Sequence, residues 1–141
     1  MILKALLKNF IYVLKHKFYV LRECYKAGIT WLGIIHDWDK FMPLLMYSYA
    51  IYYYTDQQKD DKLMDEIFKL HYQCSPHHWE LWNGDEMPIE YVKEMGCDLN
   101  AMGYSYPGAL SGIDYYKLHK DEFVLHPKSR KILEDYLGYV L

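Results

Sequence analysis

Five histidines and two aspartates occupy positions of this sequence where an ordinary hydrophobic core would place apolar residues. They are His16, His36, His71, His77, His78, Asp37 and Asp98. An ionisable side chain is costly to bury unless it is hydrogen-bonded, paired with an opposite charge or bound to a metal ion. Imidazole and carboxylate groups are ordinary ligands of divalent transition metals. The set therefore predicts a metal site, and the metal suggests an enzyme.

The segment HDWDK supplies an adjacent histidine and aspartate, His36 and Asp37, which we expect on a helix that begins near Thr30. The side chains of consecutive helical residues diverge by about 100°, yet both can reach one ion held beside the helix. Lys40 follows about one turn later and could receive a phosphate oxygen. The alternative is the start of a surface helix that carries solvated charges.

His16 precedes His36 by 20 residues, and a hairpin near residues 27–30 could bring the two together. The alternative for His16 is a histidine satisfied within an apolar core. Asp98 lies on a helix face with Met95 and Met102, where a carboxylate calls for a cation. Its alternative role is to cap a neighbouring helix or to pair with a basic side chain such as Arg22.

Three further histidines lie close together around Pro76. His71 is on the inward face of a helix over residues 62–74, and His77 and His78 follow the proline. A loop at this point could fold both imidazoles over the site. We expect one of the pair to turn to solvent or to orient a ligand, and the spacing does not decide which.

The elements that must position these residues all have the period of helices. Helices are predicted over residues 2–26, ending at Gly28, over 44–54 and 62–74, from Pro88 through Met102, and over 127–137. Residues 77–82 are expected to form a short turn or helix, and residues 103–112 to be irregular. No alternating strand pattern, repeat or second domain is evident, so residues 1–141 are predicted to form one all-α domain, a helical bundle.

Composition limits the classes of function. The chain has 141 residues, 52% of them hydrophobic, with a net charge of −3 and a pI of about 6.1, so nothing favours binding to a nucleic-acid duplex. Its three cysteines show no CxxC spacing and are predicted to be reduced, in the cytoplasm. A thiolate ligand from Cys74 or Cys97 is a minor alternative. The 16 tyrosines suit the edge of a core or a homo-oligomer interface.

The N-terminal 21 residues are apolar but are interrupted by Lys4, Lys8, Lys15 and Lys17, unlike a secretory signal. No apolar run reaches the roughly 20 residues that a transmembrane helix needs. We expect an amphipathic helix packed on the domain. A basic helix on a membrane surface is the alternative.

The order of these residues on an all-helical chain resembles the HD superfamily of metal-dependent phosphohydrolases. The resemblance implies that His16, His36, Asp37 and Asp98 are the four basic metal ligands. His71 and either His77 or His78 resemble the added ligands of the two-metal members. HDWDK is similar to the HDxxK variant, in which the lysine contacts phosphate.

A closer resemblance covers nearly the whole chain, to a small family from bacteria and their phages. Its pattern matches HDWDKF at 36–41, SPHHW at 75–79, MP at 87–88 with EM at 94–95, and LHPKSRK at 125–131. Three positions depart from it: Asp39 replaces a serine, Ser75 an asparagine and Leu99 a tryptophan. None of these removes an expected ligand, and the family supplies no substrate.

These observations together predict an HD-type phosphohydrolase with one or two ions of Mn, Fe, Co, Ni or Zn. Water activated by the metal would attack a phosphate ester, with a nucleotide as the substrate by analogy. The expected catalytic residues are Asp37, Lys40 and Glu94. Lys40 would neutralise charge on the phosphoryl oxygens, and Glu94 would act as a base or orient a ligand. Trp38, Trp79 and Tyr104 could stack on a base. The alternatives are a non-catalytic module that binds a nucleotide, signalling molecule or protein, and a structural domain whose imidazoles only fill the core.

Overall fold

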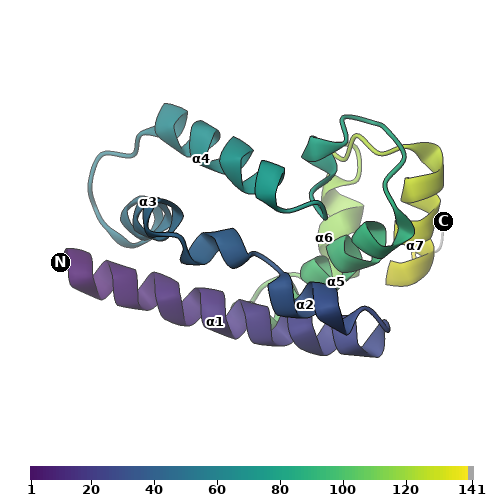
Figure 1. Cartoon of the computed structure of the whole chain (residues 1–141), viewed down its shortest axis with the longest axis horizontal. Coiled ribbons are helices and arrows are strands. Elements are labelled where there is room, and N and C mark those ends of the chain that lie inside the picture. The colour runs from purple at the N-terminus through teal and green to yellow at the C-terminus, as the bar shows by residue number, and fades with distance from the viewer. Residues whose placement is uncertain (140–141) are drawn as a thin grey trace.

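The computed structural model describes residues 1–139, which form seven α-helices and two short 3₁₀-helices (Figure 1). The α-helices are α1 (Ile2–Lys26), α2 (Thr30–Ile35), α3 (Pro43–Tyr54), α4 (Asp61–Cys74), α5 (Ile89–Ser105), α6 (Gly112–His119) and α7 (Pro127–Leu137). The 3₁₀-helices are η1 (Trp38–Phe41) and η2 (Trp79–Leu81). No strand occurs within residues 1–139, and the predicted all-α fold is confirmed.

The long helix α1 organises the fold, because α2, α3 and α5 all pack against it (Figure 1). Its buried face repeats every three or four residues, as an amphipathic helix requires, and includes Ala5, Val13, His16 and Val20. The close approach of α2 depends on Gly33, since a Cβ there would lie 2.8 Å from the Cβ of Cys24. This packing holds the end of α2 beside the middle of α1.

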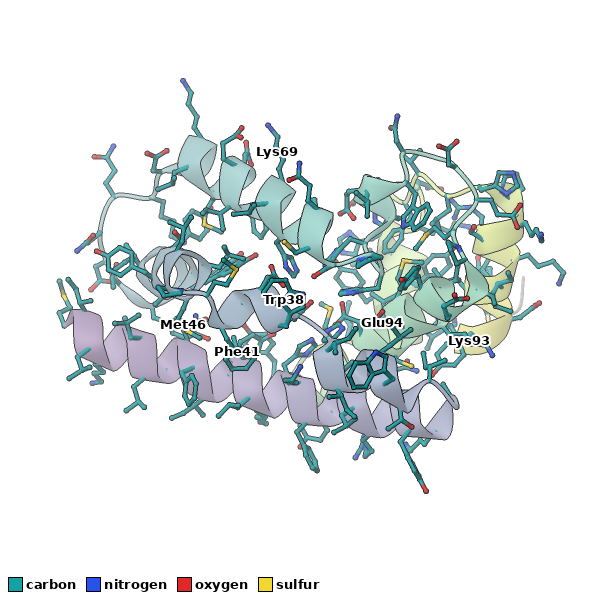
Figure 2. The ribbon with its side chains drawn as sticks, in the orientation of Figure 1. Trp38, Phe41, Met46, Lys69, Lys93 and Glu94 are labelled. Atoms are coloured by element: carbon teal, nitrogen blue, oxygen red, sulfur yellow. The ribbon has the colours of Figure 1, made fainter. Side chains whose placement is uncertain are left out.

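Three separate apolar clusters hold the helices together. One joins α5 to α6 and α7 around Tyr116 and Leu133, a second joins α1 to α5 around Val20 and Cys97, and a third joins α3 to α4 around Leu45. Between them lies a group of buried polar side chains, to which Glu94 near the middle of Figure 2 belongs. Polar residues therefore occupy a region that one continuous core would otherwise fill.

The prediction that His36 and Asp37 lie on a helix is wrong. Helix α2 ends at Ile35, His36 is its C-cap with ψ 128°, and Asp37 adopts the left-handed conformation with φ 50°. Aspartate is one of the few non-glycine residues that tolerate this conformation. The His36 carbonyl accepts a hydrogen bond of 2.6 Å from Lys17 Nζ instead of bonding within a helix. The break lets both side chains point into the molecule instead of diverging.

The region around residues 103–119 also differs from the prediction. Helix α5 continues past Gly103 to Ser105, and a helix that was not predicted, α6, begins at Gly112. The Ser111 hydroxyl accepts a hydrogen bond from the Asp114 amide and caps α6. This signal was present in the sequence as serine followed three residues later by an acid.

None of the helices within residues 1–139 is both long enough and apolar enough to cross a membrane. The N-terminal helix α1 is amphipathic and packs on the domain through one face, as predicted.

Candidate metal centre

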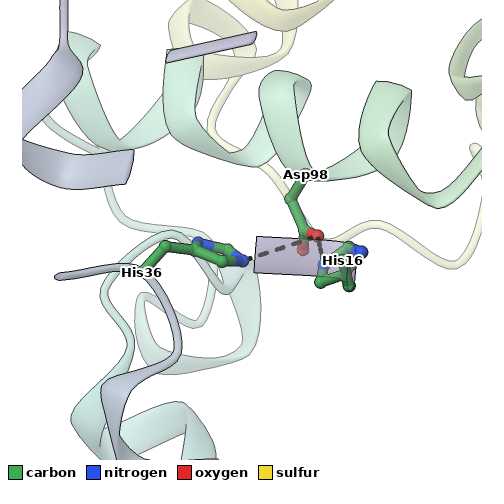
Figure 3. Close-up of side chains that lie close together, drawn as sticks. All are labelled: His16, His36 and Asp98. Atoms are coloured by element: carbon green, nitrogen blue, oxygen red, sulfur yellow. Dashed lines mark hydrogen bonds and ion pairs between the residues drawn. The ribbon is translucent and has the colours of Figure 1, made fainter. Parts of the chain in front are cut away.

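The structure brings all seven predicted metal ligands together from α1, the α2–η1 turn, α4, the loop before η2, and α5. Several sets of three residues place their ligand atoms within 4.8 Å of one another. We call His16, His36 and Asp98 the first ligand set (Figure 3), and Asp37, His71 and His78 the second ligand set. His77 lies between them and contributes to a further set with His78 and Asp98.

In the first ligand set, His16 is oriented by contacts on both ring nitrogens. Its Nε2 lies 2.8 Å from Asp98 Oδ1, and its Nδ1 lies 3.1 Å from Ser105 Oγ. The Ser105 hydroxyl donates its hydrogen to the Ala101 carbonyl at 2.8 Å. Because a hydroxyl has one hydrogen, Ser105 must accept from His16 Nδ1–H. His16 Nε2 and the carboxylate oxygen therefore face the same point, and a cation there would satisfy both.

Glu94 holds two imidazoles at once. Its Oε1 lies 3.0 Å from His36 Nδ1 and 3.4 Å from His77 Nδ1, and all three side chains are buried. Burial raises the pKa of Glu94, although the hydrogen bond from His36 acts in the opposite direction. With Nδ1 of each ring directed at Glu94, the Nε2 atoms of both rings point towards Asp37 and Asp98.

Asp37 belongs to the second ligand set and also faces the first. Its Oδ2 lies 3.4 Å from His36 Nε2, whereas its Oδ1 lies 3.6 Å from His71 Nε2 and 3.5 Å from His77 Nε2. Burial acts to raise the pKa of Asp37, but the surrounding histidines and Lys40 hold it well below its usual range. The two oxygens of one ionised carboxylate thus face different imidazoles, which is the arrangement of a bridging ligand.

The second ligand set depends on two residues that sequence reasoning did not assign. Asp39 is fully buried, and its Oδ2 accepts from His71 Nδ1 at 2.7 Å, while its Oδ1 accepts from the Ser75 hydroxyl at 3.2 Å. Both residues are departures from the sequence pattern described above, and the structure shows that they contact each other. The sequence feature that could have pointed to Asp39 is that HDWDK contains a second carboxylate close to His36 and Asp37.

His78 is the least constrained of the five imidazoles. Its Nε2 lies 3.0 Å from His71 Nε2, its Nδ1 lies 3.7 Å from Glu80, and 22% of its side chain is exposed. The neighbouring His77 is buried. Both imidazoles border the centre, so neither turns fully to solvent.

The donor set fits a divalent transition metal. His16, His36 and His71 each direct Nδ1 to an outer acceptor and Nε2 inwards, which is how proteins orient metal-binding imidazoles. His77 also points Nε2 inwards, and its Nδ1 lies 3.4 Å from Glu94. Five buried side-chain atoms within residues 1–139 have no hydrogen-bond partner, and three of them belong to the predicted ligands: His36 Nε2, Asp37 Oδ1 and His77 Nε2. Unsatisfied buried polar atoms of this kind call for an ion or water.

The charges of the site agree with this fit. Burial lowers the pKa of His36, and it lowers the pKa of His77 to about 3, so both rings are neutral and have a lone pair available. Burial acts to raise the pKa of Asp98, but His16 and its neighbours hold it below the usual range. Neutral imidazoles beside ionised carboxylates are the protonation states that metal binding requires.

Lys40 lies at the edge of the centre. Its Nζ is 2.6 Å from Asp37 Oδ2 and 5.7 Å from the centroid of the Tyr49 ring. Burial acts to lower the pKa of Lys40, but Asp37 raises it, so the side chain is an ammonium group. A positive charge is therefore held against the Asp37 carboxylate.

A cavity of about 300 Å³ opens onto the centre, and its lining includes His16, Lys40, His71, His78 and Asp98. Its other walls are mainly aromatic and include Tyr12, Tyr49, Tyr53, Tyr54, Tyr72 and Tyr106. We call it the tyrosine cavity. These tyrosines come from α1, α3, α4 and the end of α5, and sequence reasoning did not assign them to a site.

The aromatic residues proposed from sequence for stacking lie elsewhere. Trp79 packs on Phe123 with ring centroids 5.8 Å apart, and Tyr104 stacks on Tyr19 at 5.6 Å. Trp38 is 51% exposed. None of the three predicted residues lines the tyrosine cavity. Trp79 instead lines a cavity with His77, His78 and Asp98, and Trp38 lines one with His36 and Asp37.

The cysteines and the remaining histidines lie outside the ligand sets found among the described residues. Cys24 and Cys97 are buried between α1 and α5, and Cys97 Sγ lies 3.1 Å from Tyr136 Oη. His119 pairs with Glu122, and the His126 side chain caps α7. The alternative of a thiolate ligand finds no geometric support.

A sequence profile of the DUF5662 family matches residues 6–139. The chain belongs to the DUF5662 family. The family is described as one of unknown function, so membership identifies no reaction. Neither the curated proteins nor the solved structures include a significant match to the chain. The activity must therefore be argued from the site itself.

Proposed function

We propose that the protein is a metal-dependent phosphohydrolase of the HD type, with divalent Mn, Fe, Co, Ni or Zn as its cofactor. The observation that carries the proposal is the common orientation of four imidazoles. His16, His36 and His71 each direct Nδ1 to an outer acceptor, and the Nε2 atoms of all four rings, His77 included, face Asp37 or Asp98. Hydrogen bonding within a core would not require the second nitrogens of neighbouring histidines to point at the same place, whereas a shared metal ion would.

Two ions account for this geometry better than one. His16, His36 and Asp98 supply one cluster of donors, and His71 and His78 supply another. Asp37 faces both clusters, with one oxygen towards His36 and the other towards His71. We therefore propose a pair of ions that share Asp37.

The residues around the centre would divide the work of phosphate-ester hydrolysis. A bound divalent ion supplies Lewis acidity, which polarises the phosphoryl group and acidifies a water molecule. Lys40 would neutralise negative charge that develops on the phosphoryl oxygens. Glu94 accepts a hydrogen bond from His36 Nδ1 and lies 3.4 Å from His77 Nδ1, so its geometry supports orienting His36 more than removing a proton from water.

The tyrosine cavity supports a small substrate with one phosphate and one or two rings. Among the described residues, Lys40 is the only lysine or arginine that lines it, so further phosphates would lack a partner. Burial raises the pKa of Tyr54 and Tyr72 to about 12, so their hydroxyls are neutral hydrogen-bonding groups. A nucleoside monophosphate fits this cavity, because it has a single phosphate for Lys40 and rings that neutral tyrosine side chains can contact. We propose a cytoplasmic site of action, in keeping with three free cysteines.

The proposal can be tested on protein purified without chelator. Metal content is measured by mass spectrometry, and hydrolysis is assayed with p-nitrophenyl phosphate, bis-p-nitrophenyl phosphate and a panel of nucleotides. We expect bound metal, and activity that chelator removes and metal restores. The Asp98→Asn variant should lose both metal and activity.

His119→Gln is the matched control, because it removes a histidine that pairs with Glu122 away from the centre. It should keep both properties. Full metal content in Asp98→Asn would contradict the metal centre. Tight retention of a nucleotide without hydrolysis in any of the five metals would instead indicate a binding module.

A further inference from the structure

The outer face of α1 is apolar and largely exposed, and it has an edge contact, between the rings of Phe10 and Phe41 of η1. Leu3, Leu7, Phe10, Ile11, Leu14 and Phe18 are between 41% and 80% exposed. Their spacing of three or four residues places them on one side of the helix, opposite the buried side that includes Val13 and His16. Figure 2 shows side chains projecting from this side of α1, away from the rest of the molecule. We call these six residues the α1 stripe.

Basic residues border the α1 stripe. At 100° per residue, Lys4, Lys8 and Lys15 lie together along one edge of it, and all three are exposed. Residues 2–22 contain five lysines and arginines and no acidic residue, whereas the rest of the chain contains 11 against 19. The positive charge is thus concentrated on the helix that carries the exposed apolar row.

We propose that α1 binds the surface of an anionic lipid bilayer, with the α1 stripe inserted at the boundary between headgroups and acyl chains. A helix with an apolar face and lysines at its edge suits this location, because long lysine side chains can bury their stems and keep the ammonium group among the headgroups. Anionic lipids attract such lysines. The face-to-face pairing of two copies of α1 would instead bring like charges together.

This docking leaves the candidate metal centre undisturbed. His16 belongs to the metal centre, and both His16 and Tyr12 line the tyrosine cavity. Neither residue lies on the side of α1 that carries the α1 stripe. The proposal does not depend on the phosphohydrolase activity, and it can fail or succeed separately.

Co-sedimentation of the full chain with vesicles tests the proposal. Vesicles of phosphatidylcholine alone are compared with vesicles that contain phosphatidylglycerol as an added anionic lipid. We expect binding to the anionic vesicles that is at least about tenfold tighter than to the neutral ones and weakens as salt is raised. Equal binding to both compositions, or binding to neither, would overturn the proposal.

Variants separate the α1 stripe from general stickiness. The double variant Leu7→Gln/Phe18→Gln should reduce binding to anionic vesicles at least about tenfold. Lys4→Gln/Lys8→Gln should also reduce it and should flatten the salt dependence. Leu118→Gln, at a 68% exposed leucine on α6, is the control and should bind as the wild type does.

Each variant must keep the wild-type helical circular dichroism and metal content, so that loss of binding reports on the surface itself. Sedimentation velocity provides the competing outcome. A stable dimer that Leu7→Gln/Phe18→Gln dissociates would assign the stripe to a second copy of the chain and overturn the membrane proposal.

Discussion

The first and second ligand sets face each other across Asp37, yet their imidazoles are held in different ways. His16 and His36 each have an outer acceptor, in Ser105 and Glu94. In the second set only His71 has a close outer acceptor, Asp39. His78 Nδ1 is 3.7 Å from Glu80, and His78 Nε2 lies 3.0 Å from His71 Nε2. Both imidazoles of the first set are therefore oriented by an outer acceptor, whereas in the second set only His71 is.

This difference predicts unequal affinities. Oriented ligands bind metal more tightly, because the protein has already restricted their rotation before the ion arrives. We therefore expect the first ligand set to hold its ion more firmly than the second. Both sets border the tyrosine cavity, the first through His16 and Asp98 and the second through His71 and His78, so an ion in either set would meet a substrate bound there.

The largest effect is expected from removing the charge that both sets share. Asp37→Asn keeps a side chain that tolerates the left-handed backbone but removes the bridging carboxylate. Metal content should fall to about a tenth of the wild type or less, and activity should disappear with it. Metal analysis after desalting checks this. Retention of one full equivalent would show that the sets do not share Asp37.

A smaller effect should separate the two sets. His16→Gln should weaken the tighter ion by about 100-fold, and His78→Gln should weaken only the looser ion, by about tenfold. Titration calorimetry with Mn²⁺ or Zn²⁺ resolves the two steps. If either variant weakened both ions equally, the centre would act as one site and the distinction between the sets would be lost.

The smallest effect is expected at Asp39, which orients His71 without facing the centre. Asp39→Asn should weaken the looser ion by up to about tenfold, less than His78→Gln does, and leave the tighter ion unchanged. Ser75→Ala, which removes only the hydroxyl bonded to Asp39, should lower the affinity for the looser ion less than Asp39→Asn does. The absorption spectrum of the Co²⁺-loaded protein reports the ligand geometry of each site. An unchanged spectrum and affinity in Asp39→Asn would remove the positioning role.

Local sequence signals gave the helices well where they were strong. Helix α1 ends at Lys26, two residues before Gly28, and helix α7 begins at Pro127. The backbone preferences of glycine and proline are intrinsic, so these boundaries are visible in the sequence. The break after Ile35 was missed, because it depends on Asp37 in a left-handed conformation and on Lys17 reaching the His36 carbonyl from α1. A contact between residues 19 positions apart is not visible in a local pattern.

The sequence by itself determined which residues were out of place in a core, because burying an imidazole or a carboxylate is costly whatever the fold. It thereby predicted residues that the structure brings together, including Asp98 and the histidine pair after Pro76. Only the tertiary structure decided how these groups are shared: Glu94 between two rings, Asp39 behind His71, and Asp37 between both sets. It also decided that six tyrosines form one cavity and that the second apolar face of α1 is left exposed. These features depend on distances between separate helices, and spacing along one chain does not fix such distances.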